Sequence, residues 1–169
     1  MISELTHHAR IFIVDDEEMN VRLLERMLRQ AGYENLSMAT DSRRALSMFV
    51  DDDPDLVLLD LHMPPPDGFE VLAAMRKLTA DAFLPIVVLT ADVMQDVRRR
   101  ALAAGATDFL SKPLDDVEVA LRIQNVLQTR FLHRQLQNHK ALLEERVRER
   151  TRMLEQTVAE LEAATRPAF

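Results

Sequence analysis

Side chains suited to phosphate chemistry stand at the ends of short apolar segments in this 169-residue chain. They comprise three carboxylates, one hydroxyl and one ammonium group: Asp15, Asp16, Asp60, Thr90 and Lys112. Clustered carboxylates repel one another unless a cation joins them, and Mg²⁺ prefers such ligands while keeping positions open for phosphate oxygens. A carboxylate can attack phosphorus and form an aspartyl phosphate, while metal and ammonium charge stabilise the phosphoryl oxygens. If the fold brings these five side chains together, the predicted site accepts a phosphoryl group.

The apolar segments before these residues predict a parallel β-sheet. Five occur: Arg10–Val14, Asn35–Ala39, Leu56–Leu59, Pro85–Thr90 and Thr107–Leu110. The first, third and fourth have continuous apolar centres, which is typical of strands buried on both faces of a sheet. Segments with helical spacing lie between them: Val21–Leu28, Ala45–Val50, Phe69–Arg76 and Val97–Ala104. This alternation predicts a doubly wound α/β sheet, whose carboxyl edge would gather the five side chains.

The chain changes character after Pro113. From Leu114 to about Ala164 it contains neither glycine nor proline, and helix-forming residues dominate. With Val126 as position a of a heptad, six of the eleven a and d positions up to Leu161 are aliphatic. A lone amphipathic helix has no partner within its own chain, so we expect it to pair with a second copy as a coiled coil. The alternative is a linker helix that is ordered only within a longer protein.

Charge and composition exclude several classes of protein. The net charge is −7, with nineteen acidic and twelve basic residues in 1–114 and nine of each in 115–169. Neither part has the basic excess of a nucleic-acid reader, so no direct nucleic-acid binding is expected. Cysteine is absent, which excludes disulfides and thiolate metal sites. No apolar run approaches the roughly 20 residues that cross a bilayer, and no signal-peptide pattern occurs, so we expect a cytoplasmic protein without membrane insertion.

Four fragments of the chain resemble two-component response-regulator receiver domains. They read I-F-I-V-D-D-E (11–17), L-V-L-L-D-L-H-M-P-P-P-D-G-F-E (56–70), V-V-L-T-A (87–91) and D-F-L-S-K-P (108–113). The resemblance covers residues 8–128 and implies a flavodoxin-like, five-stranded parallel sheet in the order 2-1-3-4-5. It implies that Asp60 is the phosphoacceptor of a signalling switch, which catalyses only its own phosphorylation and dephosphorylation. The long C-terminal helix would then extend the fifth helix of the domain.

The resemblance also assigns residues to the metal and the phosphoryl group. Asp16 and Asp60 would bind Mg²⁺ directly and Asp15 through water, with the backbone carbonyl of His62 completing the set. Lys112 would contact the phosphoryl group. An Asp-Asp pair after a strand is otherwise often a helix cap, so this assignment depends on Asp60 and Lys112 lying beside it.

Two further residues resemble a switch pair. Thr90 and Phe109 would turn inward on phosphorylation, although a phenylalanine at a strand end is often plain core. Pro113 resembles a cis-proline that positions the preceding lysine, and Ala91 would keep the mouth of the site open. The three prolines at 64–66 depart from the commoner single proline and should stiffen the loop after the acceptor.

The region after the receiver suggests a route for output. Residues 142–154 resemble the signalling helix that joins receivers to cyclic-di-GMP or histidine-kinase modules. We therefore expect a receiver domain at 8–128 and a coiled-coil dimerisation helix at 129–165, with a sensor histidine kinase or phosphotransfer protein as phosphodonor. The alternatives are the N-terminal regulatory part of a longer signalling protein and an interaction module that does not need phosphorylation. An enzyme of the haloacid-dehalogenase type would need an aspartate where His62 stands.

Overall fold

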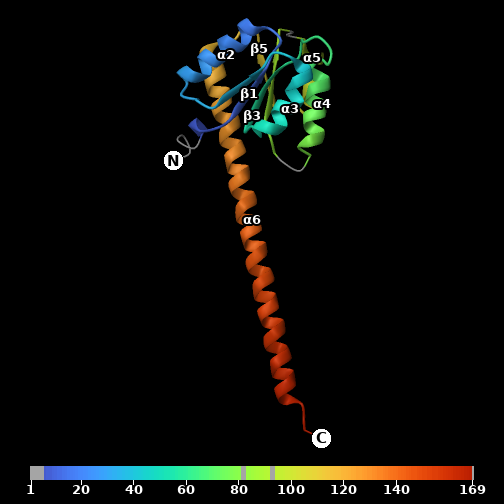
Figure 1. Ribbon diagram of the computed structural model, residues 1–169. Coiled ribbons are helices and arrows are strands. Elements are labelled where there is room, and N and C mark those ends of the chain that lie inside the picture. Colours follow the sequence, from blue (N-terminus) through green and yellow to red (C-terminus); the bar gives the residue numbers. More distant parts are fainter. Residues whose placement is uncertain (1–5, 81–82, 92–93, 169) are drawn as a thin grey trace. The chain divides into compact units, whose positions relative to one another are not determined.

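Five strands alternate with helices in the computed structural model, which describes residues 6–80, 83–91 and 94–168 (Figure 1). The strands are β1 (Ile11–Val14), β2 (Leu36–Ala39), β3 (Leu56–Asp60), β4 (Ile86–Thr90) and β5 (Asp108–Ser111). The helices are α2 (Glu18–Gln30), α3 (Ser42–Asp52), α4 (Gly68–Leu78), α5 (Gln95–Ala103) and α6 (Asp116–Thr165). All neighbouring strands pair in parallel, in the order β2-β1-β3-β4-β5. The predicted fold class is therefore confirmed, including the long C-terminal helix.

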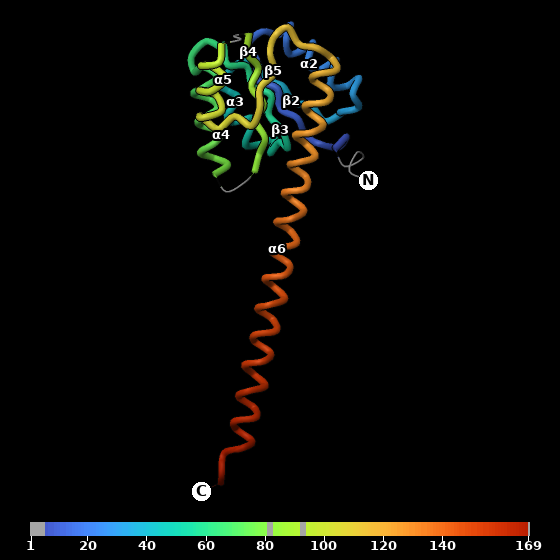
Figure 2. The backbone as a smooth tube through the Cα atoms, turned by 180° about the vertical axis from the view of Figure 1, so that it is seen from behind, coloured from blue at the N-terminus to red at the C-terminus, as the bar shows by residue number. Residues whose placement is uncertain are grey.

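Helices cover both faces of the sheet, as Figures 1 and 2 show together. Alternate residues of a strand point to opposite faces. In β1, Ile11 and Ile13 pack with α2 and the first turns of α6, whereas Phe12 and Val14 pack with α3, α4 and α5. Every residue of β1, β3 and β4 is buried, which explains their continuous apolar sequences. The residues at the carboxyl ends of these strands are consequently held by a rigid framework.

Local signals in the sequence set the ends of the helices. The residues after α2 and α5 include Gly32 and Gly105, whose φ angles of +94° and +105° suit glycine at a helix end. At the start of α4, Asp67 accepts a hydrogen bond from the Glu70 amide (2.9 Å), and Glu70 accepts one from the Asp67 amide (2.7 Å). This capping box fixes where the chain turns into α4, soon after β3 ends.

Small corrections to the predicted elements concern helix faces and strand ends. Val50 and Leu102 belong to the apolar spacing of the predicted helical segments 45–50 and 97–104, yet they are 59% and 46% exposed. Each follows a buried residue, Phe49 or Ala101, and one step along a helix turns the side chain by about 100°. The strand expected to end at Leu59 includes Asp60, and the last strand extends to Ser111.

The chain divides into two compact units, Met1–Phe131 and Leu132–Phe169. Helix α6 contributes to both units. All described residues of the second unit are exposed, including the five aliphatic residues of its predicted seam: Leu136, Leu143, Val147, Leu154 and Leu161. None of the helices described is both long and apolar enough to span a membrane.

Candidate functional site

The carboxyl edge of the sheet brings the predicted functional residues together. Asp15 follows the last residue of β1, whereas Asp60 and Thr90 are themselves the last residues of β3 and β4. Lys112 follows the last residue of β5. Because β1 and β4 both flank β3, and β5 pairs with β4, these strand ends lie at one edge of the sheet.

Lys112 bridges two of the carboxylates. Its Nζ lies 3.1 Å from Asp15 Oδ2 and 3.2 Å from Asp60 Oδ1. The two aspartate side chains are almost wholly buried, whereas the lysine side chain keeps one-fifth of its surface exposed. A charge-assisted contact of this kind in a buried setting is stronger than a surface ion pair. The ammonium group therefore already lies beside the predicted acceptor oxygen.

The three carboxylates are close enough to share one metal ion. Asp15, Asp16 and Asp60 each offer an oxygen, and these oxygens lie within 4.8 Å of one another. Asp15 Oδ1 accepts hydrogen bonds from the Glu17 amide (2.9 Å) and Asn20 Nδ2 (3.4 Å). By contrast, Asp16 Oδ1 is buried and has no hydrogen-bond partner among the described residues. A buried carboxylate oxygen without a partner beside two further carboxylates fits the oxygen ligands that Mg²⁺ prefers.

Burial and neighbouring charges shift the ionisation of this site. Burial raises the pKa of the Asp60 carboxyl, the Asp15 carboxylate raises it further, and Lys112 partly opposes both effects. Burial also disfavours the ammonium form of Lys112, but the nearby Asp60 and Asp15 carboxylates outweigh this and raise its pKa. The lysine therefore stays charged near neutral pH, where it can hold anionic oxygens.

The backbone after β3 positions Asp60 closely. The His62 amide donates a hydrogen bond to Asp60 Oδ1 (3.3 Å), while the His62 side chain is exposed. The Gly68 amide donates to the Leu61 carbonyl (3.2 Å) as the loop folds back over the strand end. A Cβ atom on Gly68 would overlap the Asp60 carbonyl oxygen and the Leu61 Cα, so only glycine fits there. In the sequence, Gly68 stood out only as one residue of the receiver-like fragment at 56–70.

The remaining predicted residues lie on β4 and β5 or shortly after these strands. Thr90 is buried, and its carbonyl accepts a hydrogen bond from the Lys112 amide (2.9 Å). The Lys112–Pro113 peptide bond is cis, as the resemblance implied. Ala91 is exposed directly after β4, and Phe109 is half-buried on β5 rather than enclosed in the core.

Comparison with protein families decides the identity of this arrangement. A model of the response regulator receiver domain matches residues 11–124 of the chain. The chain belongs to the response regulator receiver family. Family membership accounts for the carboxylate cluster, because receivers take phosphoryl groups on an acidic site that binds Mg²⁺.

Curated relatives of this receiver are longer proteins. Response regulator PleD of Caulobacter vibrioides is 44% identical over 123 residues, which are 73% of this chain and 26% of that protein. Regulatory protein AtoC of Escherichia coli is 36% identical over 139 residues, which are 82% and 30% of the two chains. The receiver chain thus spans about a quarter of the length of PleD and under a third of AtoC.

Solved structures match the receiver fold over nearly their whole length. Chemotaxis protein CheY4 of Vibrio cholerae is similar with a TM-score of 0.66 and 31% identity. The match covers 70% of this chain and 98% of CheY4. The match therefore accounts for almost all of CheY4 and leaves nearly a third of this chain unmatched.

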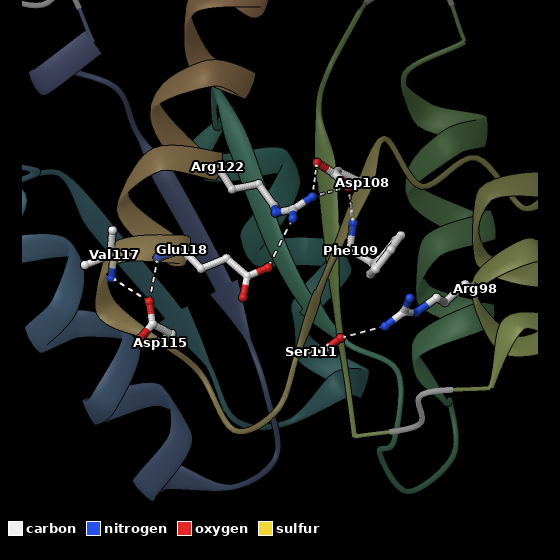
Figure 3. A network of polar contacts seen from close by, with 8 residues as sticks. All are labelled: Arg98, Asp108, Phe109, Ser111, Asp115, Val117, Glu118 and Arg122. Atoms are coloured by element: carbon white, nitrogen blue, oxygen red, sulfur yellow. Dashed lines mark hydrogen bonds and ion pairs between the residues drawn. The ribbon is translucent and has the colours of Figure 1, made fainter.

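The receiver carries contacts around Phe109 that the sequence did not reveal. Arg98 of α5 lies over the Phe109 ring, with its Cζ 4.3 Å from the ring centre, and it donates a hydrogen bond to Ser111 Oγ (Figure 3). Arg122 of α6 lies 5.8 Å from the same ring centre and is held by Asp108. These contacts join two helices to β5, so no periodicity within one element could have indicated them.

Proposed function

We propose that this receiver accepts a phosphoryl group on Asp60, in a Mg²⁺-dependent reaction, from a sensor histidine kinase or a phosphotransfer protein. The observation that carries the proposal is the contact between Lys112 Nζ and Asp60 Oδ1 at 3.2 Å, beside two further carboxylates. A carboxylate, a cationic side chain and an acidic cluster at one strand edge are the parts that phosphoryl transfer to aspartate needs.

Asp60, Lys112 and Thr90 have separate roles in the proposed reaction. A carboxylate oxygen of Asp60 forms a new bond to phosphorus, while the bond from phosphorus to the donor breaks and its electron pair leaves with the donor. The nucleophile is already ionised, so no general base is required. Lys112 then exchanges part of its contact with Asp60 for a phosphoryl oxygen, and the Thr90 hydroxyl donates a hydrogen bond to another.

Asp16 and Asp60 are the residues that we expect to hold Mg²⁺ directly, with Asp15 acting through water and the His62 carbonyl completing the set. Both oxygens of Asp15 already accept hydrogen bonds, whereas Asp16 Oδ1 has no described partner, which supports this division. Bound there, Mg²⁺ would supply positive charge to the phosphoryl oxygens.

The proposed output passes through Thr90, Phe109 and the face formed by α5 and α6. Thr90 moves toward the phosphoryl group, Phe109 takes the space that it leaves, and the face changes shape. Because α6 continues into the second unit, this change alters how two copies of the C-terminal helix pair. The exposed aliphatic seam of that helix supports pairing with a second copy, since pairing would remove this apolar surface from water.

A second candidate is that this receiver is the regulatory part of a longer protein that makes or degrades cyclic-di-GMP, or that acts as a kinase. The 26% share of PleD that the chain covers favours a longer protein, and the resemblance of residues 142–154 to a signalling helix favours these kinds of output. In both cases the chemistry of Asp60 is the same, and only the partner of the C-terminal helix differs.

Labelling with acetyl phosphate tests the proposal against an interaction module that needs no phosphorylation. We expect the purified chain to gain one phosphoryl group in Mg²⁺, none in EDTA, and none after Asp60→Asn. Asp96→Asn is the matched control, because this aspartate is exposed on α5 and should leave labelling unchanged. Wild-type chain that is folded but unlabelled in Mg²⁺ would favour the interaction module.

The output is tested separately by light scattering with and without beryllofluoride, which mimics the phosphoryl group. A change in association state or in partner binding is expected when Asp60 is occupied. An unchanged association state, coil geometry and partner binding would contradict the relay through α6 while leaving phosphorylation of Asp60 intact.

A further inference from the structure

The side chain of Arg98 contacts two residues on one face of β5. Its Nη2 donates a hydrogen bond to Ser111 Oγ (3.0 Å), while its Cζ lies 4.3 Å from the centre of the Phe109 ring (Figure 3). Residues two apart in a strand point to the same side, so one side chain can reach both. The planar guanidinium suits this geometry, because it stacks on a ring while its edge donates hydrogen bonds.

A second guanidinium on the same ring is bound differently. Arg122 Nη1 lies 2.9 Å from both carboxylate oxygens of Asp108, and its Nη2 lies 3.1 Å from Glu118 Oε1. Its Cζ is also more distant from the ring, at 5.8 Å. The partners of Arg98 in the described part of the chain are instead a hydroxyl and an aromatic ring. Of the two arginines, Arg98 is therefore the one whose described contacts involve the Phe109 ring most directly.

The geometry points to Arg98 as a positioning residue that holds Phe109 in its resting place. This inference rests on the proposed function, in which Phe109 moves inward when Asp60 is phosphorylated. The ring is now only half-buried and is covered by Arg98, so moving inward gives up this contact. Because Ser111 precedes Lys112, the same arginine also restrains the strand end that carries the phosphoryl-binding lysine.

The strength of the contact sets the size of the expected effect. A cation stacked on an aromatic ring shifts an equilibrium about threefold to thirtyfold, depending on how well water is excluded. A ligand that needs the switched arrangement binds with an apparent affinity that is proportional to the fraction of molecules in it. Removing Arg98 should therefore lower the beryllofluoride concentration needed for half-maximal switching by about threefold to thirtyfold.

A single fluorophore can follow the ring. The chain has no tryptophan, so Phe109→Trp introduces a unique one that keeps an aromatic face for Arg98. We compare this variant with and without Arg98→Met in a beryllofluoride titration with Mg²⁺. Arg98→Met should increase acrylamide quenching of the resting indole and lower the half-maximal concentration, and Arg98→Lys should restore part of both. Arg99→Met, which changes an exposed arginine of the same helix, should alter neither.

The possible outcomes separate the inference from the function on which it rests. An unchanged half-maximal concentration in Arg98→Met, with a normal fluorescence response, would overturn the role of Arg98 and leave the switch intact. An indole that never responds, in a chain still labelled on Asp60, would remove Phe109 from the switch and the inference with it. If urea denaturation shows that Arg98→Met is too unstable for the titration, Ser111→Ala replaces it. This variant removes the hydrogen bond from Arg98 to Ser111 and should shift the half-maximal beryllofluoride concentration in the same direction.

Discussion

Lys112 Nζ lies 3.2 Å from Asp60 Oδ1 and 3.1 Å from Asp15 Oδ2, so one ammonium group joins the carboxylates of two neighbouring strands. The contact comes from opposite requirements. The carboxylates need a cation because they are buried close together, whereas the proposed phosphoryl transfer requires the lysine to remain movable so that it can also meet a phosphoryl oxygen. Its one-fifth exposure is consistent with both, since its stem packs against the site while part of it still meets solvent.

Lys112→Met should lower both the stability of the apo protein and its labelling. Loss of the ammonium group leaves Asp15 and Asp60 buried without their cation, which should cost about 2 kcal/mol, below the range for fully buried pairs because Lys112 is partly exposed. Urea denaturation in EDTA measures this cost, and Mg²⁺ should restore part of the stability. Lys77→Met, on the exposed face of α4, is the control. Equal stability of the two variants in EDTA would contradict the bridging role.

Asp60→Asn should stabilise the metal-free protein at neutral pH. The pKa of Asp60 is raised on folding by burial first and by Asp15 second, so the folded state binds its proton more tightly than the unfolded state. The free energy of unfolding therefore falls as the pH rises from the ordinary value of 3.8 through the raised pKa. Asparagine does not ionise, so the variant does not lose stability in this way. Its free energy of unfolding should exceed that of the wild type at pH 7, and the difference should decrease as the pH falls. Urea curves in EDTA at several pH values test this, and a wild type that is the more stable at pH 7 would disprove it.

Gly68→Ala should disrupt the loop that holds Asp60. The new methyl group would overlap the Asp60 carbonyl oxygen and the Leu61 Cα, and backbone cannot move aside as a flexible side chain can. We expect a loss of about 3 kcal/mol in the free energy of unfolding, together with slower labelling. Ala73→Gly, at an exposed position of the same helix, should cost only about 1 kcal/mol and leave labelling unchanged. A Gly68→Ala protein with wild-type stability and labelling would refute the close approach.

Most of the fold could be predicted because its parallel strands are buried on both faces. Segments such as Ile11–Val14 then carry an apolar residue at every position, which no exposed strand would tolerate. The site followed from the same fact, because carboxyl ends of neighbouring parallel strands meet at one edge. Asp15, Asp60 and Lys112 therefore lie together although up to 97 residues separate them in sequence.

Contacts between different helices, strands and loops could not be predicted from the sequence. Periodicity indicates which face of a helix is buried, but it does not say which neighbour that face meets. The stacking of Arg98 on Phe109 depends on how α5 is rotated against β5, and the fit of Gly68 depends on how the loop folds back over Asp60. Neither contact produces a periodic pattern in the sequence from which it could be predicted.

A charged residue in the predicted seam of the C-terminal helix should weaken self-association of the chain. Leu143 belongs to the predicted seam and Leu142 does not, yet their exposed fractions in the single chain are similar, at 52% and 49%. Leu143→Lys should raise the dimer dissociation constant at least tenfold, because both copies lose a buried leucine, whereas Leu142→Lys should have little effect. Sedimentation equilibrium of the full chain measures this. Equal effects of the two substitutions, or a wild type that stays monomeric at every concentration, would contradict the coiled coil.

The position of the phosphoryl group shows directly whether Asp60 is the phosphoacceptor. After incubation with acetyl phosphate and Mg²⁺, borohydride reduction converts an aspartyl phosphate into homoserine, and peptide mass spectrometry locates the converted residue. We expect conversion at Asp60 alone, with Asp15 and Asp16 unchanged. Conversion at another aspartate, or none in a chain that is folded and bound to Mg²⁺, would contradict this expectation.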